Sequence, residues 1–266
     1  MTSDSPEGRA TRHPAHDDVS AELRSWFTTS VPELGYVATE QWYGSVSESG
    51  SAMGTRLILT VDDPREVAAA LGEARRRVGG PITVWVDDRA RHVRLDRALR
   101  AAGCAPAKAT VHLALVGALA ARPGPRSLTA HDVGVDELEE WAVTKLQSFG
   151  DTELQPSGEQ LAREVAVRTP ELALAKLQLA RLDGVAVSIL GHYGGPDQLV
   201  FNLGTRVPYR HRGIAQELLS RWVQAGRAEG CRSLMINADH GGAPEALYRA
   251  MGFVDEIYWY QRYELA

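Results

Sequence analysis

A short run of proline and glycine, A-R-P-G-P-R at 121–126, divides the chain into two parts of similar length. It follows an apolar segment and favours an extended connection, because proline fixes its own φ angle and restricts the residue before it. On both sides the sequence predicts strand, helix, strand, helix, a glycine-containing pair and a last strand, in that order. We therefore expect a duplicated α/β unit with mixed sheets rather than one larger fold.

Hydrophobic periodicity predicts the elements of each half. Before the break we expect helices at 19–27, 64–78 and 94–102, and strands at 36–41, 56–61, 82–86 and 109–115. After it we expect helices at 135–146, 158–167, 214–229 and 243–251, and strands at 174–182, 185–193, 199–205, 233–237 and 256–263. The predicted organisation is a disordered polar leader at 1–17, an N-terminal unit at 18–120, a linker at 121–127 and a C-terminal unit at 128–266.

Composition narrows the classes of function. The chain has 266 residues, of which 44% are hydrophobic and 24% charged, a mix that supports a sizeable core. Its net charge of −5 argues against broad nucleic-acid binding, which leaves a basic footprint. The longest apolar stretch, at 111–121, is about half of what a membrane-spanning helix needs. We expect neither nucleic acid nor membrane as a partner, and leave monomer and homodimer open.

The two cysteines, Cys104 and Cys231, lie one in each half. This spacing predicts no disulfide framework and fits a reducing cytoplasm. His13 and His16 form H-x-x-H in the leader, where an unstructured tail is a poor platform for metal ligands. We therefore expect no bound metal.

The segment most informative for function is L-V-F-N-L-G-T-R-V-P-Y-R-H-R-G-I-A-Q-E at 199–217. An apolar strand leads into a short basic loop and then a helix. Gly213 allows a close approach of the backbone, and Ala215 keeps the next turn uncrowded. The first N–H groups of a helix have no intrahelical partner, and the helix dipole is positive at this end. The junction therefore predicts an anion site of the kind that binds a pyrophosphate.

Two motifs in this half resemble those of the GNAT superfamily of acyl-CoA-dependent N-acyltransferases. Arg210-x-x-Gly213-x-Ala215 resembles the acyl-CoA signature R/Q-x-x-G-x-G/A. The run A-L-Y-R-A-M-G-F at 246–253 resembles the A-x-L-Y-x-x-x-G-F segment that follows the next strand in that family. The motifs occur in order, with the expected helix and strand between them. The chain as a whole resembles tandem GNAT proteins whose N-terminal half is degenerate.

The resemblance implies acetyl-CoA as cosubstrate and direct attack of an amine on the thioester, without an acyl-enzyme. It implies that Tyr248 is the general acid that protonates the departing thiolate. The strand residues implied to contact pantetheine are Leu203, Gly204 and Thr205. The loop residues implied to hold the pyrophosphate are His211, Arg212, Gly213, Ile214, Ala215 and Gln216.

Several positions keep a second interpretation. Tyr248 is also placed to pack with Leu247 and Phe253 as an ordinary helix aromatic. The family often has an asparagine seven residues before this tyrosine, where the present sequence has Gly241. Asn237 either takes over that contact to CoA or caps a turn.

The 199–205 strand contains no carboxylate, so the general base is open. The candidates by placement are Asp197, His192 and Glu153. A water relay, or an acceptor of low pKa, would make a dedicated base unnecessary.

The N-terminal half lacks the anion loop. The corresponding segment, T-V-D-D-P at 60–64, has two carboxylates and no glycine. Asp63 suits a helix N-cap and Pro64 a first helical residue, so we expect this half not to bind CoA. Its Leu99-x-x-x-Gly103-Cys104 loosely matches the end of the second motif. The segment 40–43 is either part of an acceptor wall or an ordinary packed strand.

The sequence therefore predicts an acetyltransferase acting on an amine of a small molecule or peptide. A non-catalytic GNAT-fold sensor of acyl-CoA or a metabolite is the alternative from another class. A protein-modifying acyltransferase is a third reading, which would need an open groove that the N-terminal half obstructs.

Overall fold

The computed structural model describes residues 34–47, 55–78, 81–150 and 154–265. The predicted leader and the predicted helix at 19–27 lie outside these residues. The first half contains β1 (Leu34–Ala38), β2 (Trp42–Ser47), β3 (Thr55–Leu59), α2 (Pro64–Arg77), β4 (Ile82–Val86), α3 (Arg89–Ala101) and β5 (Cys104–Leu115).

The second half begins with β6 (Leu128–Asp132), a 3-10 turn (Val135–Glu137), α4 (Leu138–Phe149) and α5 (Gly158–Glu171). It continues with β7 (Ala175–Leu182), β8 (Val185–Tyr193), β9 (Asp197–Thr205), a second 3-10 turn (Val207–Tyr209) and α6 (Ile214–Ala228). It ends with β10 (Ser233–Asp239), α7 (Ala243–Met251) and β11 (Phe253–Leu265). The predicted mixed α/β fold is confirmed.

The differences from the predicted elements have local causes. β2 and β6 were not predicted as strands, and in β6 only Leu128 is fully buried, so its pattern is weak. Helix α3 begins five residues earlier than predicted, because Asp88 caps it and accepts a hydrogen bond from the Arg91 N–H at 2.7 Å.

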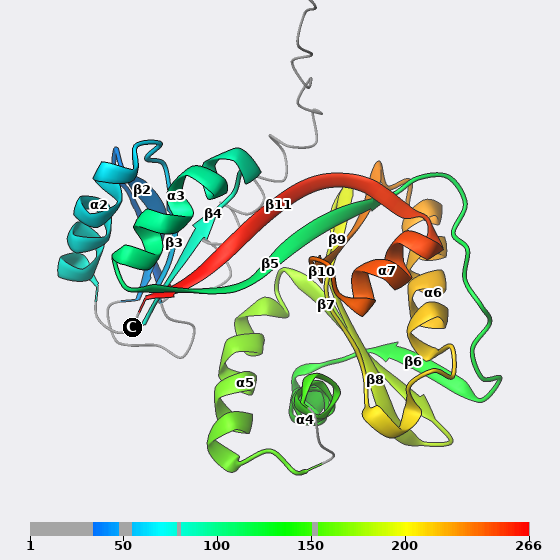
Figure 1. The fold of residues 1–266 in the computed structure, drawn as a ribbon. Helices are drawn as coiled ribbons and strands as arrows, with labels where there is room; N and C mark the ends of the chain where they lie inside the picture. Colours follow the sequence, from blue (N-terminus) through cyan, green and yellow to red (C-terminus); the bar gives the residue numbers. More distant parts are fainter. Residues whose placement is uncertain (1–33, 48–54, 79–80, 151–153, 266) are drawn as a thin grey trace, which may run out of the picture.

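The eleven strands of the described residues form one sheet in the order β1-β2-β3-β4-β11-β5-β10-β9-β8-β7-β6. Its centre is built by exchange between the halves. The last strand of the first half, β5, pairs with β10 of the second, and the last strand of the second half, β11, pairs with β4 of the first. The two exchanged strands pair with each other and run between the halves in Figure 1. The domain boundary at 121–127 stays a prediction, because the sheet itself is continuous.

The ends of α3 and α7 repeat one local geometry. Each helix is followed by a glycine in the left-handed region, Gly103 with φ 88° and Gly252 with φ 108°, and then by an exchanged strand. At Gly252 an added Cβ would lie 3.1 Å from the Ala118 carbonyl oxygen, so this turn also needs the missing side chain. The equivalence supports the predicted duplication.

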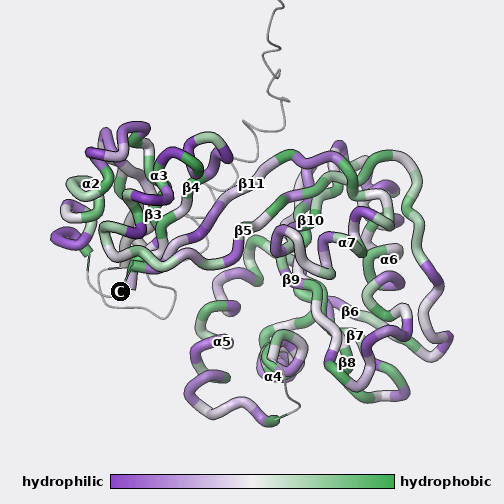
Figure 2. Tube along the Cα trace, viewed as in Figure 1, coloured by the Kyte–Doolittle hydropathy of each residue, from purple (hydrophilic) through white to green (hydrophobic). Residues whose placement is uncertain are grey.

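Separate clusters of buried side chains anchor the helices. Helices α2 and α3 pack with β3, β4 and the end of β11, while α6 and α7 pack with β5, β10 and β9. We call the side of the sheet covered by α6 and α7 the helix face. On the other side, which we call the opposite face, Ala114, Met235 and Tyr258 form a cluster of their own. The helices in Figure 2 carry both hydrophilic and hydrophobic stretches, as expected for helices with one buried side.

Within the described part of the chain, no helix combines the length and apolar character that crossing a membrane requires.

The strand exchange predicts that the C-terminal half does not fold alone. A fragment of residues 121–266 lacks β5 and would expose unpaired edges of β10 and β11. We expect it to be aggregated or unfolded by size-exclusion chromatography and circular dichroism. Co-expression with residues 1–120 should restore a soluble complex, and a fragment that folds cooperatively as a monomer would contradict the prediction.

Candidate functional site

The strands β9 and β10 form a fork. They pair in parallel only where 197–200 lies beside 233–236. Beyond this point β9 stays paired with β8 as far as Thr205, and β10 stays paired with β5 as far as Asp239. The facing edges of 201–205 and 237–239 therefore have no ladder between them. Such an opening leaves backbone N–H and C=O groups available to an extended ligand.

The predicted pantetheine-contacting residues lie on the β9 arm of this fork. Leu203, Gly204 and Thr205 are its last three residues. The Ser188 hydroxyl donates to the Gly204 carbonyl at 2.7 Å and lies 3.0 Å from the Thr205 hydroxyl. An added Cβ at Gly204 would lie 2.7 Å from the Ser148 Cβ, so α4 packs directly on the arm. The arm is thus held on two sides.

The basic loop forms a concave backbone turn at the start of α6. His211, with φ 62°, and Gly213, with φ 79°, are both in the left-handed region, on either side of Arg212. The first backbone hydrogen bond of α6 runs from the Glu217 N–H to the Gly213 carbonyl at 2.9 Å. Among the described residues, the N–H groups of 211–216 have no partner. Alternating turns of this kind aim successive N–H groups at an anion, and the helix dipole adds to them.

The two arginines of the loop are engaged with the protein. Arg210 donates from Nε to the Thr205 carbonyl at 3.0 Å and from Nη2 to the Ser148 carbonyl at 2.9 Å. Arg212 donates to the Pro208 carbonyl at 3.1 Å and lies over the Tyr209 ring. The first contact of Arg210 joins the loop to the end of the β9 arm. The motif arginine therefore holds the basic loop against the β9 arm, and the backbone N–H groups of 211–216 stay without a partner in the described part of the chain.

The predicted linker packs against this loop. The Arg122 N–H donates to the Gln216 side-chain oxygen at 2.8 Å, and the Gly124 N–H donates to Glu217 at 3.2 Å. An added Cβ at Gly213 would lie 3.0 Å from the Pro123 carbonyl oxygen. The side-chain oxygen of Gln216 is thus bound by the linker, while its backbone N–H has no backbone partner among the described residues. Sequence reasoning did not anticipate this contact.

Tyr248 lies on α7 with 6% of its surface exposed. Its ring meets Phe253 edge-on, with centroids 6.4 Å apart, as the packing interpretation expects. Burial raises the pKa of its phenol, which keeps the group protonated. A packed ring whose phenol stays protonated is compatible with both interpretations, and the acid role stays a prediction.

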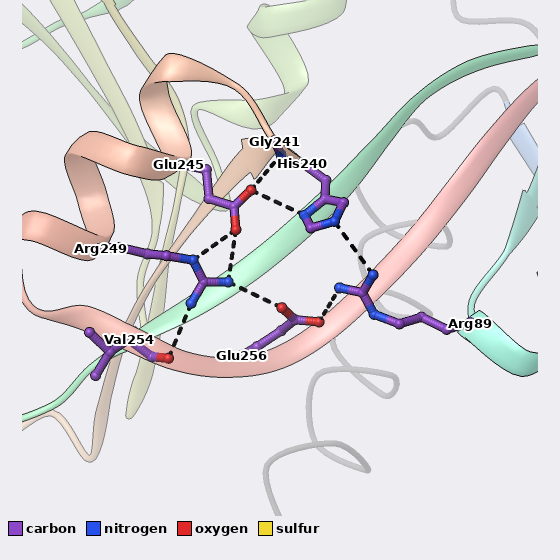
Figure 3. Close-up of polar contacts among 7 residues, drawn as sticks. All are labelled: Arg89, His240, Gly241, Glu245, Arg249, Val254 and Glu256. Atoms are coloured by element: carbon purple, nitrogen blue, oxygen red, sulfur yellow. Dashed lines mark hydrogen bonds and ion pairs between the residues drawn. The ribbon is translucent and has the colours of Figure 1, made fainter.

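An ion-pair network holds the start of α7, which includes the position where GNAT proteins often have asparagine. Gly241, in the left-handed region, donates its N–H to Glu245 at 2.6 Å. Glu245 also lies 3.1 Å from His240 Nδ1 and accepts from Arg249 at 2.8 Å. Figure 3 shows that Glu256 extends the network. It accepts a hydrogen bond from Arg249 at 3.1 Å and another, at 2.6 Å, from an arginine of α3.

That residue of α3 is Arg89, which also lies 3.5 Å from His240 Nε2 and over the Trp259 ring at 4.8 Å. The network therefore connects α7 to the first half. Burial raises the pKa of Glu245, but hydrogen bonds from Gly241 and Arg249 outweigh it and leave the pKa lowered.

The three candidates for the general base and the candidate for a further contact to CoA lie in different parts of the chain. Asp197 begins β9, at the end away from the fork, and forms a two-point ion pair with Arg232. His192 is buried on the helix face with its ring 6.1 Å from Trp222, and burial lowers its pKa. Glu153 lies outside the described residues. Asn237 is the first β10 residue beyond the last pair with β9, so it lies at the fork.

In the first half, carboxylates occupy the equivalent loop. Asp63 caps α2 by accepting from the Arg65 N–H at 2.9 Å. Asp62 pairs with Arg91 at 2.9 Å and with Arg94 at 3.3 Å, and these arginines lower its pKa. Within the residues the structure describes, no three His, Cys, Asp or Glu side chains gather to hold a metal ion.

No protein-family model matches the sequence, and no curated protein matches it. Solved structures do match the fold. A GCN5-related N-acetyltransferase from Kribbella flavida aligns with a TM-score of 0.66 at 18% identity, covering 96% of each chain. One from Sphaerobacter thermophilus aligns with a TM-score of 0.61 at 19% identity, covering 96% of this chain and 89% of that one.

A tandem GNAT protein from the clavulanic acid biosynthesis pathway aligns with a TM-score of 0.54 at 14% identity, covering 97% of this chain and 89% of the other. The chain has the fold of GNAT proteins over nearly its whole length, and the resemblance stated from the two motifs is confirmed at the level of fold.

The network at α7 predicts a pH-dependent loss of stability in Glu245→Gln. A carboxylate with a lowered pKa stabilises the fold above its ordinary pKa, and this contribution disappears as pH falls through the folded value. We expect the variant to lose about 1–3 kcal/mol of unfolding free energy at pH 7. The difference from wild type should shrink below the ordinary carboxyl pKa of 4.5.

Urea unfolding at several pH values measures this difference. The matched control is Glu159→Gln, which removes an exposed partner of Arg163 and should change stability little. An equal loss in both variants, or a loss independent of pH, would contradict the role of the network.

Proposed function

We propose that the protein is an acyl-CoA-dependent N-acyltransferase that transfers an acetyl group from acetyl-CoA to a primary amine of a small molecule or peptide. One observation supports this proposal most strongly. The basic loop, whose backbone N–H groups at 211–216 have no partner among the described residues, follows the part of β9 that has separated from β10. Arg210 joins this loop to the end of β9. A ligand with a phosphate-bearing end and a long polar arm fits that combination.

In this proposal the pyrophosphate of acetyl-CoA accepts hydrogen bonds from the N–H groups of 211–216, and the pantetheine arm lies along Leu203, Gly204 and Thr205. The thioester then reaches the fork. The neutral acceptor amine attacks the carbonyl carbon, the C–N bond forms, and the nitrogen loses one proton. The C–S bond breaks as Tyr248 protonates the sulfur, and Tyr248 regains a proton from solvent. No metal takes part.

A second candidate function is a non-catalytic acyl-CoA sensor. It is favoured by the deep burial of the Tyr248 ring and by Gly241 at the place of the common asparagine. A panel of primary amines with acetyl-CoA discriminates the two, because a sensor binds acetyl-CoA and releases no free CoA.

The cofactor site is tested by calorimetric titration with acetyl-CoA and with CoA. We expect one site in the wild type and a loss of affinity of about tenfold or more in Gly213→Asp, because the new carboxylate opposes the pyrophosphate at the helix start. The control is Gly103→Asp, at a left-handed glycine of the first half with no atom within 4 Å of an added Cβ. Loss of binding in the control alone, or no binding by wild type, would reject this site.

The acid role is tested by Tyr248→Phe. If Tyr248 protonates the thiolate, kcat should fall by about 100-fold while the Kd for acetyl-CoA stays unchanged. The control is Tyr263→Phe, whose hydroxyl bonds His92 and Asp96 in the first half, and which should affect stability rather than kcat. Unchanged kcat in Tyr248→Phe would remove Tyr248 from the mechanism without removing the transfer activity.

A further inference from the structure

His112 is a buried side chain whose two ring nitrogens form no hydrogen bond with the described residues. Only 2% of its surface is exposed. Its neighbours are the rings of Tyr258 and Tyr260, with centroids 5.5 Å and 5.8 Å away. Burial lowers the pKa of His112 to about 4, so the ring is neutral near pH 7. A neutral imidazole always offers one nitrogen as an acceptor.

The position of His112 is tied to the fork. It lies on β5, directly opposite Asn237 in the antiparallel pair with β10. Asn237 is the first β10 residue beyond the last pair with β9, at Ile236 and Val200. Residues opposite each other in such a pair point to the same face, with Cβ atoms about 5 Å apart. His112 and Asn237 therefore stand side by side at the opening.

Their side chains lie on the opposite face of the sheet from Tyr248. Along β10, Ile236 and Ala238 join the core beneath α6 and α7, to which Tyr248 also belongs. Side chains alternate along a strand, so Asn237 lies on the opposite face, as Met235 does. Tyr248 thus belongs to the core on one face of the sheet, and His112 lies on the other face.

We propose that His112 is a catalytic residue of the C-terminal site and accepts the proton of the attacking amine. This inference rests on the proposed acetyl transfer and adds the proton acceptor that the strands of the C-terminal half do not supply. It also gives the first half a direct role, because the exchanged strand β5 delivers His112. The site is incomplete without the N-terminal half.

The nitrogen of the neutral amine bonds to the thioester carbon, and one N–H proton passes to the acceptor nitrogen of His112. The C–S bond breaks, and the thiolate takes a proton from Tyr248 or from water. His112 then returns its proton to solvent, and Tyr248, where it was the donor, regains a proton from solvent. The products are the amide and CoA, with no net gain or loss of protons.

The unpartnered nitrogens favour a ligand contact over a purely structural role. A buried polar group without a partner costs roughly 1–3 kcal/mol, so a structural imidazole is normally bonded to protein. Ser188, also fully buried in the sheet, donates to the Gly204 carbonyl. His192 lies 3.4 Å from the Tyr193 carbonyl through Nδ1. His112 differs from both, and an amine at the fork would supply the missing partner.

The test uses the full chain and an amine from the panel that the wild type acetylates. We expect His112→Ala to lower kcat by about 100-fold with an unchanged Kd for acetyl-CoA. Added imidazole should then restore part of the rate, and methylimidazoles should do so in proportion to their basicity. His112→Gln, which keeps bulk and polarity without a basic nitrogen, should stay slow. The control is His92→Ala, a partly buried histidine of the first half that lies 2.9 Å from the Tyr263 hydroxyl, which should neither lose kcat nor respond to imidazole.

The outcomes separate the two proposals. Wild-type kcat in His112→Ala, or a reduced kcat that imidazole does not restore while the variant still binds acetyl-CoA, would overturn the role of His112 and leave the transfer activity standing. If wild type binds acetyl-CoA but acetylates no amine of the panel, the proposed function fails and the role of His112 falls with it. If His112→Ala does not fold, the same comparison is made with His112→Gln, whose kcat must be low for the inference to hold.

Discussion

The exchange of the last strands between the two halves is the constraint on which the rest of the structure depends. β5 fills the place beside β10, and β11 fills the place beside β4. Each half thus completes the sheet of the other, and the buried residues Val111 and Leu113 of β5 belong to the core beneath α6 and α7. Because unpaired strand edges are costly, neither half retains its central pairing without the other. The two halves therefore form one continuous sheet rather than two independent units.

The exchange also shapes the fork. β10 is paired with β5 along 235–239, so it is supported on one side where it leaves β9. The β9 arm is supported in turn by β8, by Ser188 and by α4. Two independently supported strands can diverge without loss of order. Arg210 then joins the β9 arm to the loop, where His211 and Gly213 both have left-handed backbone angles, a conformation typical of anion-binding loops. The backbone N–H groups of 211–216 have no partner within the described residues, and the arginine side chains of the loop bond to carbonyl groups of the protein.

Much of the fold was predictable because local patterns were strong. The strands at 82–86 and 185–193 and the helix at 243–251 have the predicted bounds. Strand β6 was missed because a short strand with one fully buried residue has little periodicity. Helix α3 starts early because Asp88 caps it, and hydrophobic periodicity alone does not indicate such a cap. The order of motif, strand and helix placed Gly213 before α6 and Leu203, Gly204 and Thr205 at the end of β9, as the structure has them, and their contacts to a ligand stay a prediction.

The sequence by itself determined the mixed α/β class, the resemblance to GNAT proteins, the basic loop before α6 and the absence of such a loop in the first half. These features are local, since each depends on residues near one another in the chain. Only the tertiary structure decided that β5 and β11 change places, that the linker binds Gln216, and that His112 stands beside Asn237 at the fork. Those relations join residues more than 90 positions apart, and no short-range pattern of polarity or glycine specifies which distant strand becomes the neighbour.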